Sequence, residues 1–243
     1  SSPVSSSPDD NYHLASIWCG LGDRADLCEP SHGDSDVKLV PEAAYKATCF
    51  AYDPGQSAAC LSPLYAEAGK KLIPTEDTNA SGGYPPVFYA VMGVFASTDV
   101  WASTAIMRVV NSLLFTGVVG LLWFALPLRR RGTLLWSIAV SVVPLGLFII
   151  PSTNPSSWAL LSACTLWLAL LGWTESTGRR RLLLGAIALL VTVMGAGART
   201  DSAIFSVISI FLVGILSFRR KKMRLTGLIF PAALIAIAAT LFL

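Results

Sequence analysis

The residues best suited to chemistry lie at the start of the chain, in the run Ser7-Pro8-Asp9-Asp10-Asn11-Tyr12-His13. Two adjacent carboxylates followed by a histidine can supply a general base or a pair of metal ligands. Asp9 can instead cap a helix, with Asp10 in the favourable first turn. Both interpretations stay open, with Asp9 and Asp10 as catalytic candidates and His13 as a substrate-binding candidate.

A second candidate is Arg108, which follows Asp99 by nine residues inside an apolar stretch, or about 14 Å along a helix. Thr104 and Asn111 share its helical face by their spacing. A charge in such a stretch usually faces a cavity or a partner. Because the guanidinium fork suits phosphate oxygens, we expect a lipid-phosphate contact, with a structural ion pair to a carboxylate in the missing part of the protein as the alternative.

Two short polar breaks between apolar runs supply the remaining candidates, Asn154, Arg199 and Asp201. Asn154 lies in Pro151-Ser152-Thr153-Asn154-Pro155, where it either binds substrate or forms a rigid turn. Arg199 and Asp201 either pair with each other or cap helix ends, or they line the same outward-facing site as the two carboxylates near the start.

The elements that must position these residues belong to a membrane protein. Of the 243 residues, 53 % are hydrophobic and 14 % are charged, whereas soluble domains carry about 25 % charged residues. The mean hydropathy is +0.61. The chain has 12 acidic and 5 basic residues up to Tyr84, and 3 acidic and 13 basic residues from Pro85 onward. This composition excludes a soluble enzyme, a fibrous protein and a nucleic-acid partner.

Three basic clusters, Arg129–Arg131, Arg179–Arg181 and Arg219–Arg224, separate the apolar runs. The two intervals between them each have room for two membrane passes of about 17–20 residues. Basic loops favour the cytoplasm, so we expect the clusters inside and the polar breaks outside. The expected helices are Trp101–Leu128, Gly132–Ile150, Ser156–Trp173, Leu182–Ala198, Asp201–Phe218 and Leu225–Leu243.

Three segments follow from this topology. Residues 1–84 form an extracytoplasmic loop, residues 85–98 an interfacial or re-entrant helix, and residues 99–243 a truncated transmembrane bundle of about six helices. The apolar run Pro85–Ala96 is too short to span, while Ser97, Thr98 and Asp99 can cap the next helix. Both ends of the chain indicate a fragment of a longer protein, lacking helices before and after it.

The outer loop contains four of the five cysteines, which predicts two structural disulfides. Three pairings are possible, and we favour the local ones, Cys19–Cys28 and Cys49–Cys60, over free thiols. A zinc site is disfavoured because neither pair has CxxC spacing. Cys164 is interpreted as a small buried apolar residue. Asn79-Ala80-Ser81 matches a glycosylation sequon, a weak signal alone.

Several segments together resemble known membrane enzymes. Pro8–Ser16 opening the loop, Tyr84–Tyr89 closing it, and Arg108 in the next helix resemble the GT-C superfamily, which comprises polytopic glycosyltransferases that use polyprenyl-phosphate sugars. Asn154–Trp158 and Gly197–Asp201 more specifically resemble a bacterial family of predicted membrane proteins, domain-of-unknown-function family 2142.

The resemblance implies an all-α polytopic fold with a GT-C-like bundle in the bacterial plasma membrane. It also implies that an acidic residue in the first outer loop acts as catalytic base or metal ligand, and Asp9 and Asp10 match that position. The usual pair is Asp-Glu or Glu-Asp, so the Asp-Asp pair leaves open which residue acts. A divalent cation, Mg²⁺ or Mn²⁺, held by these carboxylates is an open alternative.

The expected reaction is inverting transfer of a sugar from a polyprenyl-phosphate donor to an envelope glycan or lipid acceptor. Arg108 or Arg199 would hold the departing phosphate, a role assigned on physical grounds alone. Two alternatives remain: a lipid-linked glycan transporter or flippase, and a non-catalytic envelope assembly protein. No nucleotide-binding or nucleophile-elbow motif is present in the sequence.

Overall fold

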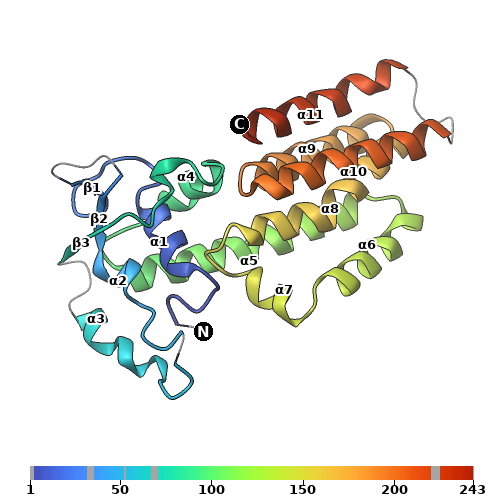
Figure 1. Cartoon of the computed structure of the whole chain (residues 1–243). Helices are drawn as coiled ribbons and strands as arrows, with labels where there is room; N and C mark the ends of the chain where they lie inside the picture. The colour runs from blue at the N-terminus through green and yellow to red at the C-terminus, as the bar shows by residue number, and fades with distance from the viewer. Residues whose placement is uncertain (1–2, 32–35, 52, 67–70, 220–224, 243) are drawn as a thin grey trace. The chain divides into compact units, whose positions relative to one another are not determined.

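The computed structural model describes residues 3–242, apart from 32–35, 52, 67–70 and 220–224 (Figure 1). The chain forms two compact units. The first comprises Ser1–Asn111 with Pro151–Pro155, and the second comprises Ser112–Ile150 with Ser156–Leu243. Helices dominate the structure, as predicted, and make up most of the second unit. Within the described residues, three helices are long and apolar enough to cross a membrane: α5 (Val100–Ala125), α8 (Ser156–Glu175) and α10 (Thr200–Arg219), the last over Thr200–Phe218.

The first unit is built around α1 (Asp10–Trp18), a short helix whose residues from His13 to Trp18 are all buried. It packs against α2 (Glu42–Tyr45) and α4 (Val87–Gly93). The approach to α4 is close: a Cβ atom on Gly20 would lie 2.3 Å from the Tyr89 carbonyl oxygen. Only glycine fits there, because any side chain would overlap the backbone of α4.

A small antiparallel sheet covers part of this core, with its strands in the order β1-β2-β3. The strands are β1 (Glu29–Pro30), β2 (Lys38–Pro41) and β3 (Leu72–Thr75), and Val40 pairs with Ile73. The remaining short helices of this unit are η1 (Ala58–Leu61), α3 (Ser62–Ala66) and η2 (Asn79–Ser81). Composition alone did not predict the sheet or the extent of the core.

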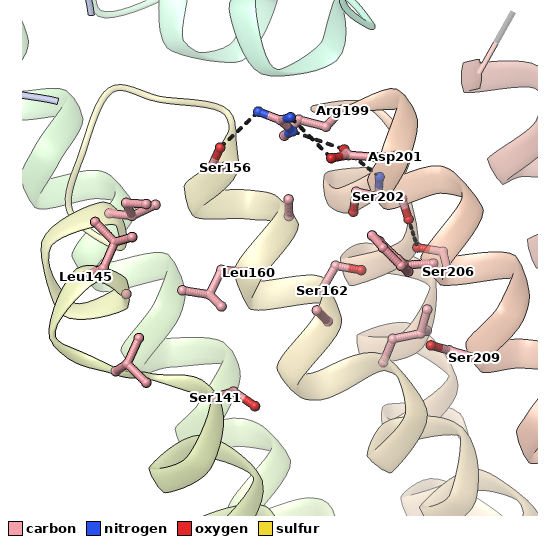
Figure 2. Close-up of a pocket in the computed structure, with 17 residues that line it drawn as sticks. Ser141, Leu145, Ser156, Leu160, Ser162, Arg199, Asp201, Ser202, Ser206 and Ser209 are labelled. Carbon is pink, nitrogen blue, oxygen red and sulfur yellow. Dashed lines mark hydrogen bonds and ion pairs between the residues drawn. The ribbon is translucent and has the colours of Figure 1, made fainter. Parts of the chain in front are cut away.

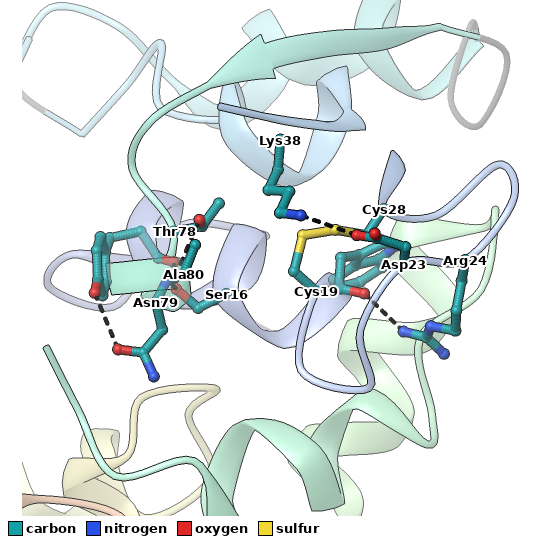
Figure 3. Close-up of a disulfide and its surroundings, with 11 residues drawn as sticks. Ser16, Cys19, Asp23, Arg24, Cys28, Lys38, Thr78, Asn79 and Ala80 are labelled. Atoms are coloured by element: carbon teal, nitrogen blue, oxygen red, sulfur yellow. Dashed lines mark hydrogen bonds and ion pairs between the residues drawn. A yellow bond between two sulfur atoms is a disulfide. The ribbon is translucent and has the colours of Figure 1, made fainter. Parts of the chain in front are cut away.

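Two disulfides brace the unit, Cys19–Cys28 and Cys49–Cys60, so the favoured local pairing is confirmed. Figure 3 shows the first disulfide with Arg24 nearby. The Arg24 guanidinium donates to the carbonyl oxygens of Trp18 at 2.7 Å and Gly93 at 3.1 Å. One side chain thus satisfies carbonyls at the C-terminal ends of both α1 and α4. Cys164 is a free, buried cysteine, as expected.

The second unit contains α6 (Leu128–Ser141), α7 (Pro144–Ile149), α8, α9 (Gly178–Ala196), α10, η3 (Leu225–Leu228) and α11 (Ile229–Phe242). The most extensive packing is between α8 and α9, and α10 contacts α8, α9 and α11. A Cβ atom on Gly195 would lie 2.5 Å from the Ser162 hydroxyl and 2.8 Å from the Ser202 hydroxyl. This glycine therefore lets α9 approach α8 and α10 closely.

The prediction of one helix over Gly132–Ile150 is wrong, because the helix is interrupted at Val142 and Val143 and a new helix begins at Pro144. Val143 is extended (φ −71°, ψ 171°), as expected for a residue before proline, and proline cannot donate the next helical hydrogen bond. The first two arginine triplets are also not loops. They occupy the first turns of α6 and α9.

The other boundaries agree better. Helix α4 lies within the expected interfacial segment, and Asp99 caps α5 by accepting the Ala102 N–H at 2.9 Å. Both α4 and the first part of α5 belong to the same compact unit as the outer loop. Residues 220–224 of the third basic cluster lie outside the described residues. The membrane side of each segment stays a prediction.

Candidate functional site

Asp10 lies at the centre of a buried polar network in the first unit. Its side chain is fully buried. The Thr153 hydroxyl donates to Oδ1 at 2.8 Å, and the Ser7 N–H donates to Oδ2 at 3.1 Å. The nearest guanidinium nitrogen of Arg108 is 3.9 Å from Oδ2. Burial raises the pKa of Asp10 to about 6, and these three partners oppose the rise.

The same network joins segments that are far apart in sequence. Asn154 donates its side-chain N–H to the Pro8 carbonyl oxygen at 3.0 Å. Asn111 donates to the Ser152 carbonyl oxygen at 2.7 Å, which fixes the proline-flanked turn on α5. The structure therefore brings three predicted site residues together, Asp10, Arg108 and Asn154.

Arg108 also holds the N-terminal segment. Its Nη2 donates to the Pro3 carbonyl oxygen at 2.8 Å and to the Ser6 hydroxyl at 3.2 Å. The side chain is 15 % exposed and its nearest carboxylate is Asp10. These contacts give Arg108 a structural role in the first unit, while the predicted ion pair with a carboxylate in a missing part of the protein stays untested. Its predicted contact with a lipid phosphate stays untested.

Asp9 differs from Asp10 in its exposure to solvent and in its hydrogen bonds. Asp9 does occupy the N-cap position of α1, as one interpretation expected, but its side chain is exposed and makes no capping hydrogen bond. Its φ of 56° places it in the left-handed region, which costs a non-glycine residue about 1–2 kcal/mol. Asp10 does occupy the first turn of α1, as that interpretation expected.

The two carboxylates do not suit a cation held between them. Both oxygens of Asp10 already accept hydrogen bonds in the interior, whereas Asp9 is exposed to solvent. Among the described residues, no group of three or more His, Cys, Asp or Glu side chains is arranged to hold a metal ion. We therefore derive no step through a metal.

His13 is packed inside the first unit, with 1 % of its surface exposed. Its Nδ1 lies 2.9 Å from the Tyr89 hydroxyl, and its ring stacks on Tyr89 and meets Tyr12 and Tyr84 edge-on. This environment gives His13 a packing role in α1. Its predicted contact with substrate stays a prediction that the placement does not favour.

Arg199 and Asp201 form a second polar group, in the second unit. The guanidinium donates to both carboxylate oxygens of Asp201, at 3.0 and 3.1 Å, and to the Ser156 hydroxyl at 3.1 Å (Figure 2). The two residues thus pair with each other, one of the two expected arrangements. Whether they also line a common site with Asp9 and Asp10 stays a prediction.

A pocket of about 440 Å³ opens below this ion pair, among α7, α8 and α10. Arg199, Asp201 and Ser156 lie at one end, where α8 and α10 begin (Figure 2). Leu145, Leu160 and other apolar side chains line the rest, with several serines among them. The pocket combines a polar end with an apolar wall, an arrangement that suits an amphipathic molecule.

Thr153 and Ser7 are the members of the Asp10 network that sequence reasoning missed. Thr153 lies inside the recognised polar break, between Pro151 and Asn154, but nothing in its type marks it as the partner of a carboxylate 143 residues away. Ser7 contributes a backbone N–H, which is independent of side-chain type and leaves no trace in sequence.

The three long apolar helices and the charged residues at helix ends define an all-α, multi-pass membrane protein. More particularly, the chain belongs to the family described as predicted membrane protein (DUF2142), whose model matches residues 1–243. No curated protein and no solved structure matches the chain.

Proposed function

We propose that this protein is a membrane glycosyltransferase of the bacterial plasma membrane. It transfers a sugar from a polyprenyl-phosphate donor to an envelope glycan or lipid acceptor at the outer face, with residues 1–84 extracytoplasmic and the arginine clusters cytoplasmic. The observation that carries the proposal is the exposed carboxylate of Asp9, held on a strained backbone beside a buried network. The resemblance to the GT-C superfamily implies a catalytic acidic residue at this position.

The geometry favours Asp9 over Asp10 as the base. A base must reach the hydroxyl that it deprotonates, and the Asp10 side chain is fully buried with both oxygens engaged. The backbone on both sides of Asp9 is anchored, because Asn154 holds the Pro8 carbonyl and Thr153 holds the Asp10 side chain. Strain that surrounding contacts maintain in this way is common at functional sites.

In the proposed reaction, the acceptor hydroxyl oxygen bonds to the anomeric carbon of the sugar while Asp9 accepts the hydroxyl proton. The bond between the anomeric carbon and the phosphate oxygen breaks, and its electron pair leaves with the polyprenyl phosphate. Attack opposite the leaving group inverts the anomeric centre. Asp10 acts as a positioning residue, since it fixes the start of α1 and does not touch the substrate.

The pocket of the second unit supports the lipid part of the proposal. Its volume, about 440 Å³, falls within the range of roughly 300–1,000 Å³ that small-molecule sites occupy. The apolar wall suits a hydrocarbon chain, and Arg199 stands at the end where two helices begin. Guanidinium groups and helix N-termini both stabilise phosphate charge, so this end of the pocket suits a phosphate. Arg108 and Arg199 both stay candidates for the departing phosphate.

The test is complementation in a strain that lacks the gene. Envelope glycans are analysed by linkage after rescue with the full-length wild type, Asp9→Asn or Asp26→Asn at equal protein levels. Asp26 is the matched control because it is also an exposed aspartate with positive φ (60°). We expect Asp26→Asn to restore the missing linkage, and Asp9→Asn to lower its formation about 10²- to 10⁴-fold, the usual contribution of a general base.

If Asp9→Asn restores the missing glycan linkage to the wild-type level, the transferase proposal is wrong. The flippase alternative then predicts that the deletion strain accumulates the lipid-linked sugar on the cytoplasmic side and that Asp9→Asn clears it. The assembly alternative predicts no accumulation of lipid-linked sugar in any strain.

A further inference from the structure

Six arginines gather where α6 and α9 begin, at the end of the second unit where α8 finishes. Arg129–Arg131 occupy the first turn of α6, and Arg179–Arg181 that of α9. The N-terminal end of a helix carries partial positive charge, so cations there are unfavourable unless an anion is present. Neither helix has a side-chain cap, since Pro127 and Thr177 make no capping hydrogen bond.

Within the described residues of the second unit, the acidic side chains supply only part of the required negative charge. Glu175, at the end of α8, accepts from Arg129 at 2.9 Å and from Arg130 at 2.7 Å. From Pro85 onward the sequence contains just two other acidic residues, Asp99 and Asp201. Asp99 directly precedes α5, and Asp201 lies in the first turn of α10. The ion pairs with Glu175 therefore account for two of the six arginines, Arg129 and Arg130.

Two of the remaining arginines are held in place by tryptophans. Arg181 lies over the Trp173 ring at 4.2 Å, and Arg131 lies over the Trp123 ring at 5.5 Å. Stacking uses the face of the guanidinium and leaves its edge N–H groups directed away from the ring, where they can donate to oxygen acceptors.

Two buried polar atoms at this end have no hydrogen-bond partner among the described residues. They are Nε of Arg131 and the hydroxyl of Ser176, which lies in the turn between α8 and α9 and is 9 % exposed. Native proteins rarely leave such groups unsatisfied, so their presence points to a missing partner. Both can donate, and the partner that suits donors beside uncompensated arginines is an anion.

We propose that this end of the second unit binds the phosphate headgroup of an anionic phospholipid, through Arg131, Arg179–Arg181 and Ser176. The phosphate oxygens accept from the guanidinium edges and offset the charge of the two helix ends. A lipid is favoured over free phosphate because large apolar side chains, Leu135, Trp136 and Leu182, lie exposed next to the arginines on the same two helices. This site is independent of the proposed sugar transfer.

The test uses the full-length protein purified in a mild detergent, with lipid binding measured by native mass spectrometry and thermal unfolding. The probes are phosphatidylglycerol, phosphatidylcholine and inorganic phosphate. We expect phosphatidylglycerol alone to bind and to raise the unfolding temperature. Arg179→Gln/Arg180→Gln should weaken its binding about thirty-fold, since each surface arginine near an anionic lipid contributes roughly fivefold.

Two further variants make the result decisive. Lys46→Gln/Lys71→Gln removes the same number of exposed positive charges from the first unit and should leave lipid binding unchanged. Ser176→Ala keeps every charge and should still weaken phosphatidylglycerol binding several-fold. The proposal is overturned if phosphatidylcholine binds equally well, if inorganic phosphate stabilises the protein as much, or if the double arginine variant and Ser176→Ala both bind like the wild type.

Discussion

Two buried carboxylates, one in each unit, are held in opposite ways. Asp10 accepts hydrogen bonds from a hydroxyl and a backbone N–H at 2.8 and 3.1 Å, and its nearest guanidinium nitrogen is 3.9 Å away. Glu175, with 2 % of its side chain exposed, pairs with two arginines at 2.7 and 2.9 Å. The first carboxylate is positioned by neutral donors, and the second is neutralised by charge.

The difference indicates different tasks. Burial with weak charge compensation raises the pKa of Asp10, so this carboxylate responds to pH. The two arginines on Glu175 instead join the elements that carry the three side chains. Asp10 accordingly lies beside the candidate base, and Glu175 fastens the end of α8 to the start of α6. The predictions below test this contrast from the largest expected effect to the smallest.

Removing the Glu175 carboxylate should have the largest effect on stability. Glu175→Ala leaves Arg130, which is only 18 % exposed, without its anion, and breaking such a pair costs about 3–5 kcal/mol. Most of the loss should come from Arg130, because Arg129 is 60 % exposed and well solvated. Unfolding in detergent, followed by tryptophan fluorescence, measures the change. Stability equal to that of the wild type would mean that the clamp contributes nothing.

The second prediction concerns pH. Because burial raises the pKa of Asp10 above its ordinary value, folding favours the protonated form, and the resulting stabilisation is complete below pH 3.8 and lost as pH rises through about 6. One pKa unit corresponds to about 1.4 kcal/mol, so this rise corresponds to roughly 3 kcal/mol across that window.

Asp10→Asn removes this titration. The difference in unfolding free energy between wild type and variant should therefore change in favour of the variant as pH rises from 4 to about 6. Stability curves for both proteins at a series of pH values provide the measurement. A difference that does not vary with pH would show that Asp10 titrates near its ordinary value in the folded protein.

The smallest expected effect has the opposite sign. Asp9→Gly places glycine at a φ of 56°, where it is unstrained, and no side-chain hydrogen bond is lost, so the protein should become more stable by about 1 kcal/mol. The same variant should fail in the glycan complementation assay. Stabilisation with loss of activity would separate catalysis from folding at this residue, and destabilisation would reveal a structural role for the carboxylate.

The elements that sequence predicted well are those with strong local signals. The long apolar runs gave α5, α8 and α10, and cysteine spacing favoured the observed disulfides. The break between α6 and α7 was missed because Val142, Val143 and Pro144 lie within an unbroken apolar run, and hydropathy does not register a change of backbone direction. Pro144 was the available signal.

The candidate site was predicted in its residue types but not in its arrangement. Asp10, Arg108 and Asn154 were each recognised from local context, and the structure shows that they share one network. Which carboxylate is exposed could not be predicted, because adjacent residues of one type differ only in how the chain turns around them. The left-handed backbone conformation of Asp9 determines that its side chain is the exposed one, and nothing in the run Pro8–Asp10 specifies that conformation.

The glycosylation sequon at Asn79 has a consequence for the timing of folding. The Asn79 side chain is closed upon Tyr84, accepting its N–H at 2.8 Å and donating to its carbonyl oxygen at 2.8 Å. The amide nitrogen that an oligosaccharide would modify is the atom that donates to the Tyr84 carbonyl, so we expect an enzyme to reach Asn79 more readily before the turn closes. In a eukaryotic host that glycosylates nascent chains, the fraction of chains glycosylated at Asn79 would therefore report how fast this turn closes relative to translocation of the chain.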